Sequence, residues 1–336
     1  MNRVSFPKII FFSIALAALA ACNGTTNNTP TIGPAPPKGT VTEFSGLSGS
    51  GPLGAFWVTL GPDSAMWVTN INANKVARVN PATGAITEFG VPTAGQLFGI
   101  ATGLDGNLWI VERSANKIAR MTTAGVVTEF NVPTASADVI FITLGPDGNL
   151  WFAEQNANKI GKVTPAGAFT EFTVPTAASS PQGISAGPDG AVWFTEANGN
   201  KIGRVTTTGV FSEFAVPTAA SGPLGITQGL DGALWFTESA TNKIGRITTA
   251  GAITEFSAGI TTGAGLDGIA PGPDGALWFT EATVSKVARI TTGGAVTEFS
   301  TGITASSSPT GIAAGPDCAM WFAETGANKV GRIAAC

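Results

Sequence analysis

The stretch GPDGNLWFAEQNANKIGKVTPAGAFTEFTVPT (residues 145–176) recurs with small changes from residue 41 to the end of the 336-residue chain. Its tryptophan returns at intervals of 42 or 43 residues. Each copy holds four short strand-like runs, separated by turn residues such as Pro-Asp-Gly. A period of roughly 40–45 residues with four strands per unit is typical of the blades of a β-propeller. The periodic tryptophans are Trp67, Trp109, Trp151, Trp193, Trp235, Trp278 and Trp321.

The two ends of the repeat region favour a closed ring over an open solenoid. VTEF (residues 41–44) is a fourth-strand motif that stands before any first strand, and the last repeat ends after its third strand, NKVGRIAAC (residues 328–336). The polar capping repeats expected of a solenoid are not visible. We therefore predict an all-β fold over residues 41–336, a seven-bladed β-propeller closed by the N-terminal strand, which completes the last blade.

The first 21 residues predict a lipoprotein signal peptide. Arg3 and Lys8 precede an apolar run (residues 9–20) that is too short to span a bilayer comfortably. The run ends in Leu-Ala-Ala-Cys (residues 19–22), which resembles the lipobox of bacterial lipoproteins. An ordinary exported protein with an incidental cysteine is the alternative.

The lipobox resemblance implies cleavage before Cys22 and lipid attached to its thiol and new amino group. Such an anchor holds a protein stably on a membrane, so we expect a place in the bacterial cell envelope. Asn23 follows the cysteine, which implies the outer membrane if the cell is Gram-negative. Residues 22–40 are polar and rich in Pro and Gly, and predict a flexible tether.

Composition excludes several classes of function. The formal net charge is −4, so there is no basic footprint for nucleic acid. The chain contains no histidine, which removes the commonest general acid and base and a frequent metal ligand. We expect a monomer whose partners are a membrane, through the lipid, and a small molecule, glycan or protein.

The repeated hairpin predicts a repeated ion pair. Counting outward from a two-residue turn at Ala250-Gly251 places Arg246 directly across from Glu255. In the last blade, the same counting leaves Arg332 to be matched by Glu43 from the N-terminal strand. Because a slip of one residue would break such pairs, we interpret them as devices that hold strand register.

Only three charges in the ring break its sevenfold pattern: Arg113, Asp138 and Asp267. All three fall in segments expected to form one loop face around the central channel, where Gln182 and Gln228 also interrupt the repeat. We predict that these five residues bind a ligand. The simpler alternative for Arg113 and Asp138 is that they pair with each other.

A further set of carboxylates follows the periodic tryptophans. Six glutamates arranged around a ring could bind a cation, since hard cations take oxygen ligands. The favoured alternative pairs each of them with the repeated lysine a few residues later. The six are Glu112, Glu154, Glu196, Glu238, Glu281 and Glu324.

Two cysteines lie in the last blade. Cys318 occupies its first turn, where most blades have glycine, and Cys336 ends its third strand. In a four-stranded meander these points lie on the same side of the ring, so we predict a disulfide in the oxidising envelope. Two free thiols are the alternative.

The repeat quoted above (residues 145–176) resembles the virginiamycin B lyase (streptogramin lyase) family, and the resemblance runs through all seven repeats. It implies the seven-bladed fold and an Mg²⁺-dependent elimination, without water, that linearises streptogramin B depsipeptides at an ester linkage. In that family, histidines just before a Gly-Ile supply the base and a substrate contact. Glutamates, one of them from a Trp-Phe-x-Glu motif, hold the metal.

This sequence departs from the family pattern at the histidines. The residues before a Gly at the start of the first strands are Phe98, Gln182, Leu224, Asp267 and Thr310. Asp267 alone can titrate, and a carboxylate is a much weaker base than an imidazole unless burial raises its pKa.

Two functions follow. The leading expectation is a lipid-anchored, non-catalytic propeller that binds a ligand and needs no cofactor. The alternative is an Mg-dependent C–O lyase acting on a cyclic depsipeptide or a related substrate, with Asp267 as the catalytic base and Glu238 or Glu281 holding the metal.

Overall fold

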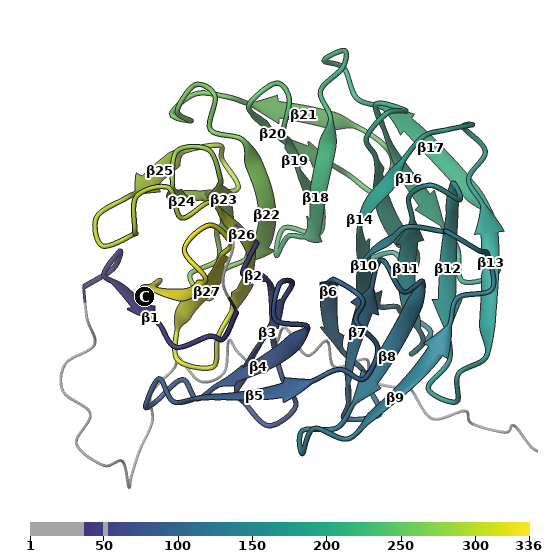
Figure 1. Ribbon diagram of the computed structural model, residues 1–336. Coiled ribbons are helices and arrows are strands. Elements are labelled where there is room, and N and C mark those ends of the chain that lie inside the picture. Colours follow the sequence, from purple (N-terminus) through teal and green to yellow (C-terminus); the bar gives the residue numbers. More distant parts are fainter. Residues whose placement is uncertain (1–36, 50–52) are drawn as a thin grey trace, which may run out of the picture.

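The computed structural model describes residues 37–49 and 53–336, and this part of the chain contains 28 β-strands and no helix (Figure 1). The strands form seven four-stranded sheets that surround a central axis as blades. This confirms the predicted all-β, seven-bladed propeller. The predicted signal peptide, Cys22 and most of the predicted tether lie outside the described residues. Within them, no helix long and apolar enough to cross a membrane is found.

Strands of the same rank occupy the same place in every blade, from the channel outward. The innermost strands are β2 (Ala55–Leu60), β6 (Leu97–Thr102), β10 (Val139–Leu144), β14 (Pro181–Ala186), β18 (Pro223–Gln228), β22 (Leu266–Pro271) and β26 (Pro309–Ala314). The second strands are β3 (Met66–Asn70), β7 (Leu108–Glu112), β11 (Leu150–Glu154), β15 (Val192–Glu196), β19 (Leu234–Glu238), β23 (Leu277–Glu281) and β27 (Ala319–Glu324). The third strands are β4 (Lys75–Val79), β8 (Lys117–Met121), β12 (Lys159–Val163), β16 (Lys201–Val205), β20 (Lys243–Ile247), β24 (Lys286–Ile290) and β28 (Lys329–Ala334). The outer strands are β5 (Ile86–Gly90), β9 (Val127–Asn131), β13 (Phe169–Thr173), β17 (Phe211–Ala215), β21 (Ile253–Phe256), β25 (Val296–Phe299) and β1 (Val41–Phe44).

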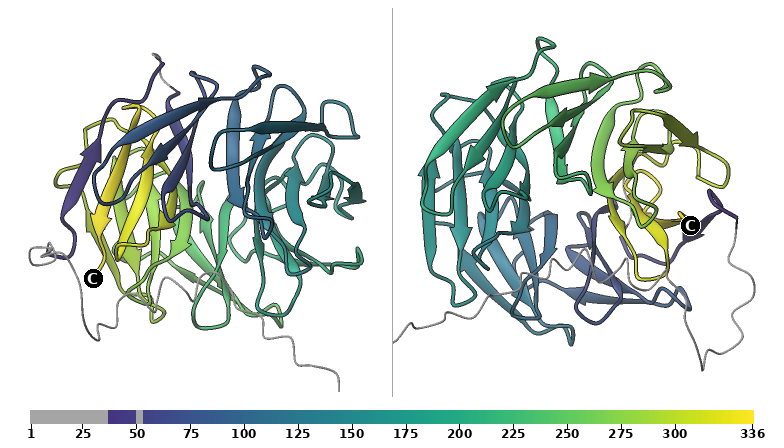
Figure 2. Two further views of the ribbon diagram at one scale, coloured as in Figure 1. Left: turned by 90° about the horizontal axis from the view of Figure 1, so that it is seen from below. Right: turned by 180° about the vertical axis from the view of Figure 1, so that it is seen from behind.

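The seventh sheet contains both ends of the described chain, in the order β1-β28-β27-β26. Strand β1 runs antiparallel to β28, with Val41 opposite Ile333 and Phe44 opposite Val330. In Figure 2 the purple β1 accordingly lies beside the yellow C-terminal strands. The segment that begins the repeat region thus takes the outer position of the last blade.

The core lies between neighbouring blades. Each second strand is buried along its whole length because it has a blade on either side, and all seven periodic tryptophans are fully buried. Trp193 of the fourth blade packs in one cluster with Phe236 and Ile247 of the fifth. Within a blade the tryptophan stacks on a phenylalanine of the outer strand, as Trp235 does on Phe256 with ring centroids 5.5 Å apart.

The ring has two faces. We call "entry face" the side that bears the segments leading into the innermost strands and the turns between second and third strands, such as residues 132–138 and 113–116. We call "turn face" the side that bears the turns between first and second and between third and fourth strands, such as residues 103–107 and 122–126.

The predicted pair of Arg246 and Glu255 is wrong by one residue. Arg246 stands opposite Thr254, because the loop between the two strands has five residues (248–252) rather than two. It is closed by a hydrogen bond from the Thr248 amide to the Ala252 carbonyl.

The shift places the two side chains on opposite faces of the sheet. Glu255 lies on the same face as Lys243, whose Nζ is 2.9 Å from its Oε2. Arg246 instead lies over the Trp235 ring and donates from Nε to Asp231 at 2.7 Å. The last blade follows the same rule.

In that blade the predicted Arg332–Glu43 pair is also wrong. Glu43 binds Lys329, with Nζ 2.7 Å from Oε2, and Arg332 binds Asp317. The expectation that Glu43 serves the last blade is nevertheless met, with the lysine as its partner.

Candidate functional site: the entry end of the channel

One residue near the start of each innermost strand lies at the entry-face end of the channel. We call this group the entry mouth; its members are Phe56, Phe98, Ile140, Gln182, Leu224, Asp267 and Thr310. The innermost strands of successive blades lie next to one another around the whole ring, including β2 beside β26. Each mouth residue is therefore supplied by a different blade.

Glycine after the mouth residue lets neighbouring strands approach closely. A Cβ added to Gly268 would lie 2.5 Å from the Thr310 carbonyl oxygen of the next blade, and one on Gly183 would lie 2.1 Å from that of Leu224. Both separations are too short for a real Cβ. The Gly-Ile motif is thus explained by backbone packing around the channel.

Two blades replace this glycine by an aromatic residue. Trp57 and Phe141 stand there, with ring centroids 4.4 Å apart although their blades are not adjacent. Phe56 packs against Phe98 of the next blade at 4.5 Å. These four rings form an aromatic wall along the first three blades. Trp57 is absent from the residues predicted above; its signal in the sequence is that it alone among the eight tryptophans lies outside the 42- or 43-residue period.

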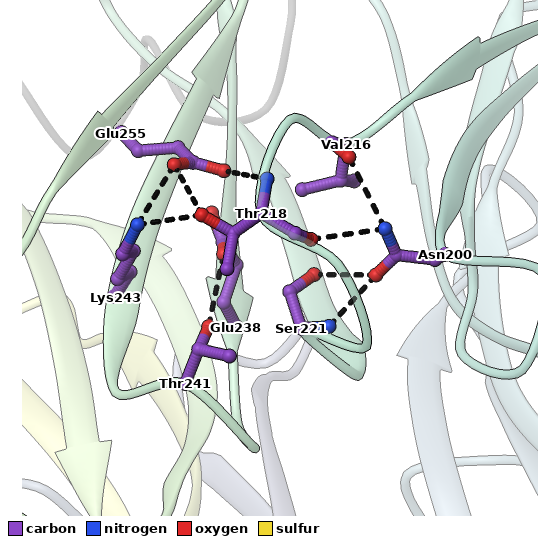
Figure 3. Close-up of polar contacts among 8 residues, drawn as sticks. All are labelled: Asn200, Val216, Thr218, Ser221, Glu238, Thr241, Lys243 and Glu255. Carbon is purple, nitrogen blue, oxygen red and sulfur yellow. Dashed lines mark hydrogen bonds and ion pairs between the residues drawn. The ribbon is translucent and has the colours of Figure 1, made fainter.

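The segments that lead into the mouth are fixed by a repeated asparagine at the turn before the third strand. Asn200 donates from Nδ2 to the carbonyls of Val216 and Thr218, at 3.1 and 3.0 Å (Figure 3). Its Oδ1 accepts from the amide and hydroxyl of Ser221. The entry into the fifth blade is therefore held by the fourth, which positions the start of β18.

Arg113 and Asp138 form an ion pair across two blades. The Arg113 Nη2 lies 2.9 Å from Asp138 Oδ2, and its Nε donates to the other carboxylate oxygen. The guanidinium also lies over the Phe98 ring, 4.6 Å from its centroid. The two residues thus have the simpler arrangement that the sequence left open, and they form one edge of the aromatic wall.

Asp267 differs from them because its carboxylate has no hydrogen-bond or ion-pair partner among residues 37–49 and 53–336. It lies within strand β22, not in a loop as its spacing had predicted. Its side chain keeps some access to solvent, yet burial by the surrounding protein raises its pKa to about 7. A carboxylate with this pKa can exchange a proton near neutral pH.

The predicted glutamines lie on opposite faces. Gln182 belongs to the entry mouth, two blades from Asp267, and is partly exposed. Gln228 is the last residue of β18 and lies at the turn face. The expectation that it shares a face with Asp267 is wrong, because an innermost strand crosses the full height of the ring between its first and last residues.

The glutamates after the tryptophans do not pair with the repeated lysines, so that favoured expectation is wrong. Lys243 stands directly opposite Glu238, but its Nζ binds Glu255 and the Thr218 hydroxyl, at 2.9 and 2.6 Å (Figure 3). Glu238 is fully buried and accepts one hydrogen bond, from Thr241 Oγ1 at 3.1 Å.

Burial raises the pKa of these carboxyls to neutrality or above. It raises the pKa of Glu238 to about 7 and that of Glu281 to about 8, and the Glu255 and Glu298 carboxylates beside them add to the effect. Both oxygens of Glu281 are buried, and a hydrogen bond with Glu298 is among the causes that raise its pKa. Each of these glutamates is thus buried, and each belongs to a different blade.

The same burial argues against the predicted metal role of Glu238 and Glu281. No group of three His, Cys, Asp or Glu residues able to hold a metal ion occurs within residues 37–49 and 53–336. Mg²⁺ keeps several waters and binds ionised carboxylates, whereas these two side chains have no exposed surface. The residues present therefore do not fit the ion.

The cysteines of the last blade are joined as a disulfide between Cys318 and Cys336, with Cα atoms 5.8 Å apart. The Ala335 amide also donates to the Cys318 carbonyl. The bond therefore fastens the C-terminus at the turn face, beside the pairing of β28 with β1.

The Virginiamycin B lyase family model matches residues 4–218 and 184–336, which between them include every blade. The chain belongs to the virginiamycin B lyase family. Virginiamycin B lyase from Staphylococcus aureus is 38% identical, with a TM-score of 0.82 over 88% of this chain and 99% of that one. A structure described as a streptogramin B lyase is also 38% identical, with a TM-score of 0.81 over 87% and 96% of the two chains.

One relative in this family was solved with a ligand. It is a catalytically inactive histidine-to-alanine variant of the Staphylococcus aureus virginiamycin B lyase with quinupristin, 38% identical, with a TM-score of 0.81 over 88% of this chain and 99% of that one. Hydrazine synthase of Kuenenia stuttgartiensis, at 16% identity and a TM-score of 0.69, shares the fold alone. No curated protein matches the sequence.

Proposed function

We propose that this member of the virginiamycin B lyase family is a lipid-anchored, non-catalytic binding protein of the bacterial envelope. The observation that carries the proposal is the absence of histidine from a chain that otherwise keeps the family fold. Replacing one histidine is enough to inactivate the Staphylococcus aureus relative. This chain has no imidazole at any position to take that role.

The ligand is bound at the entry mouth. Asp267 supplies a carboxylate with free hydrogen-bonding capacity, and the aromatic wall of Phe56, Trp57, Phe98 and Phe141 supplies apolar surface. Ligand sites in proteins commonly combine an apolar lining with a few placed polar groups. A small molecule with an apolar body and a cationic or N–H donor group suits this combination.

Anchoring is proposed through lipid on Cys22. The support is the signal sequence with its lipobox, followed by the polar, Pro- and Gly-rich residues 23–36. Growth of expressing cells with labelled palmitate tests this directly. Wild-type protein is expected to carry the label and Cys22→Ala to lose it; an unlabelled wild-type protein would remove the anchor.

A C–O lyase with Asp267 as its base is the second candidate, favoured by the pKa of about 7 that burial gives this carboxyl. In such an elimination the Asp267 carboxylate takes a proton from carbon while the C–O bond of the ester breaks, leaving an alkene, a carboxylate on the departing oxygen and a protonated Asp267. Asp267→Asn removes the base without changing the shape of the side chain.

Calorimetric titration with quinupristin separates the candidates from an inert scaffold. We expect saturable binding by the wild-type protein, weakened at least tenfold in Asp267→Asn and unchanged in Gln228→Ala, a matched polar change on the turn face. Equal binding by all three proteins would contradict a site at the entry mouth. Formation of a linear product would favour the lyase.

A further inference from the structure

The chain outside the structure joins the propeller at the turn face. Residues 37–40 lead into β1 on this side, where the Gly39 amide donates to the Ala334 carbonyl at 2.8 Å. Lys38 Nζ lies 2.6 Å from Asp274 Oδ2, in a turn between the first and second strands of the sixth blade. The segment that carries Cys22 is therefore attached opposite the entry mouth.

Exposed apolar side chains gather on the same face. Five large hydrophobic residues are exposed among the described residues. Four of them lie in the turns of this face: Leu104, Val126, Val210 and Leu230, with exposed fractions of 65%, 64%, 63% and 46%. They come from the second, fourth and fifth blades, so they lie along one side of the ring. The fifth, Leu53, lies at the entry face and is 45% exposed.

Two of these residues depart from the repeat. Leu104 and Leu230 follow a glycine and precede the turn aspartate, at a position where the other five blades have proline. The change adds a longer apolar side chain to the outside of a turn whose backbone does not need it. Packing within the ring therefore does not account for leucine there.

Charge also distinguishes the two faces. The seven turn aspartates are matched by the seven repeated Arg or Lys residues of the third strands, and Lys38 adds one further positive charge. Six of the aspartates are held in ion pairs of this kind; these are Asp63, Asp147, Asp189, Asp231, Asp274 and Asp317. Both Asp138 and Asp267 and all the glutamates lie toward the entry face. An anionic membrane surface thus repels the turn face less than it repels the entry face.

The centre of the turn face, unlike its rim, carries no charged side chain among the described residues. A cavity of about 380 Å³ opens the channel there, lined by the ends of the innermost strands and the turns that follow them. Its lining includes Leu60, Leu144, Leu230 and Pro271, and contains no ionisable side chain. The middle of this face is therefore uncharged and is lined by apolar side chains together with threonines.

We propose that the turn face rests on the lipid bilayer that carries the Cys22 anchor, with Leu104, Val126, Val210 and Leu230 at the lipid interface. The inference rests on the proposed lipid anchor. Fourteen residues separate Cys22 from Pro37 and can reach at most about 50 Å when extended, so they do not by themselves set the orientation. The exposed apolar side chains of the turn face set it, and the entry mouth then faces away from the membrane.

Fluorescence of matched surface labels tests this orientation. Leu104→Cys and Leu53→Cys place an environment-sensitive dye on exposed leucines of opposite faces, in the full lipidated protein. The protein is reconstituted on vesicles of phosphatidylethanolamine with a minority of phosphatidylglycerol. We expect a blue shift and quenching by spin-labelled lipid at residue 104, at least threefold stronger than at residue 53. Equal quenching, or stronger quenching at residue 53, overturns the proposal, and Val210→Cys serves as a second reporter.

Flotation of the same sample separates the two proposals. Lipidated protein that floats with the vesicles while the labels at residues 104 and 210 stay in water contradicts the membrane-facing turn face alone. Protein that does not float, like the Cys22→Ala control, contradicts the lipid anchor, and the orientation fails with it.

Discussion

Lys329 of the last strand binds Glu43 of the first across 286 residues of sequence, with Nζ 2.7 Å from Oε2. The same carboxylate accepts the Thr304 hydroxyl at 2.7 Å. In the fifth blade, Lys243 and Thr218 hold Glu255 in the same way. Strand β1 therefore makes the contacts of an ordinary outer strand, although it comes from the other end of the chain.

Removing this carboxylate is expected to weaken the ring. Burial raises the pKa of Glu43, but hydrogen bonds from Lys329 and Thr304 outweigh it and hold the pKa below its usual 4.5. Glu43→Gln is expected to lower the free energy of unfolding at pH 7 by about 1–3 kcal/mol. Because the stability from a depressed pKa is lost as the pH falls through it, the difference narrows below about pH 4. Urea denaturation measures both values.

The matched control is Glu255→Gln, which removes the same contacts within one blade. The two variants are expected to lose similar stability. A neutral effect of Glu43→Gln beside a costly Glu255→Gln would mean that β1 does not hold the last blade in solution.

The number of blades could be predicted from the sequence, but side-chain pairing could not. The period of the tryptophans reports blade packing directly, since each fills the space between two blades. The partner of Glu255 depends on the length of one loop, and a five-residue turn reads like a two-residue one when Ala250-Gly251 supplies the only strong turn signal. The wrong loop length therefore led to Arg246 being predicted as the partner of Glu255 in place of Lys243.

The candidate site was likewise only partly predictable from the sequence. The unusual charge of Asp267 was visible in the sequence, but its missing partner and raised pKa depend on the ring around it. The buried state of Glu238 was not visible, because strand position alone does not tell which carboxylate a lysine will take. The role of Trp57 was not predicted because this tryptophan does not belong to the 42- or 43-residue repeat.

The buried glutamates predict a loss of stability in mild alkali. Burial, and then the neighbouring Glu171 carboxylate, raise the pKa of Glu154 to about 8, so the folded protein keeps a proton that the unfolded chain releases near pH 4.5. Stability from this group is therefore expected to fall as the pH rises from about 4.5 to about 8. Glu154→Gln is expected to raise the urea midpoint at pH 8.5 and to change it little at pH 5.

Blade one supplies a natural precedent for that variant. Asn70 stands in place of the glutamate, and its amide donates to the Ser48 carbonyl at 2.9 Å. A variant Glu154→Gln that loses stability equally at both pH values would show that the carboxyl is not protonated in the fold.

The buried carboxylate of Asp267 is expected to lower the stability of the folded protein. Burial raises its pKa from 3.8 to about 7. The free-energy penalty of ionising the folded protein at this residue therefore grows as the pH rises from about 3.8 to about 7, and it is constant at higher pH. Asp267→Asn is expected to stabilise the protein by at least about 1 kcal/mol at pH 8 and by much less at pH 4. Asp138→Asn, which breaks the pair with Arg113, is expected to destabilise instead. Loss of stability in both variants at pH 8 would argue that Asp267 has a partner.

The disulfide predicts a dependence on reductant. Cys318 and Cys336 close a loop of 18 residues, and in the chain-entropy account such a loop contributes about 3 kcal/mol. Cys336→Ser is expected to lower the melting temperature, and dithiothreitol to lower that of the wild-type protein by a similar amount. A wild-type melting temperature insensitive to reductant would contradict a stabilising bond.

This protein, which keeps the family fold without histidine, is proposed to bind a ligand at its entry mouth without opening the ring of a cyclic compound. Mass spectrometry of quinupristin after prolonged incubation with the purified protein and Mg²⁺ tests it most directly. We predict that the cyclic compound is recovered intact, as from a sample without protein. A linear product that forms with the wild-type protein and not with Asp267→Asn would contradict the claim and make this chain a lyase.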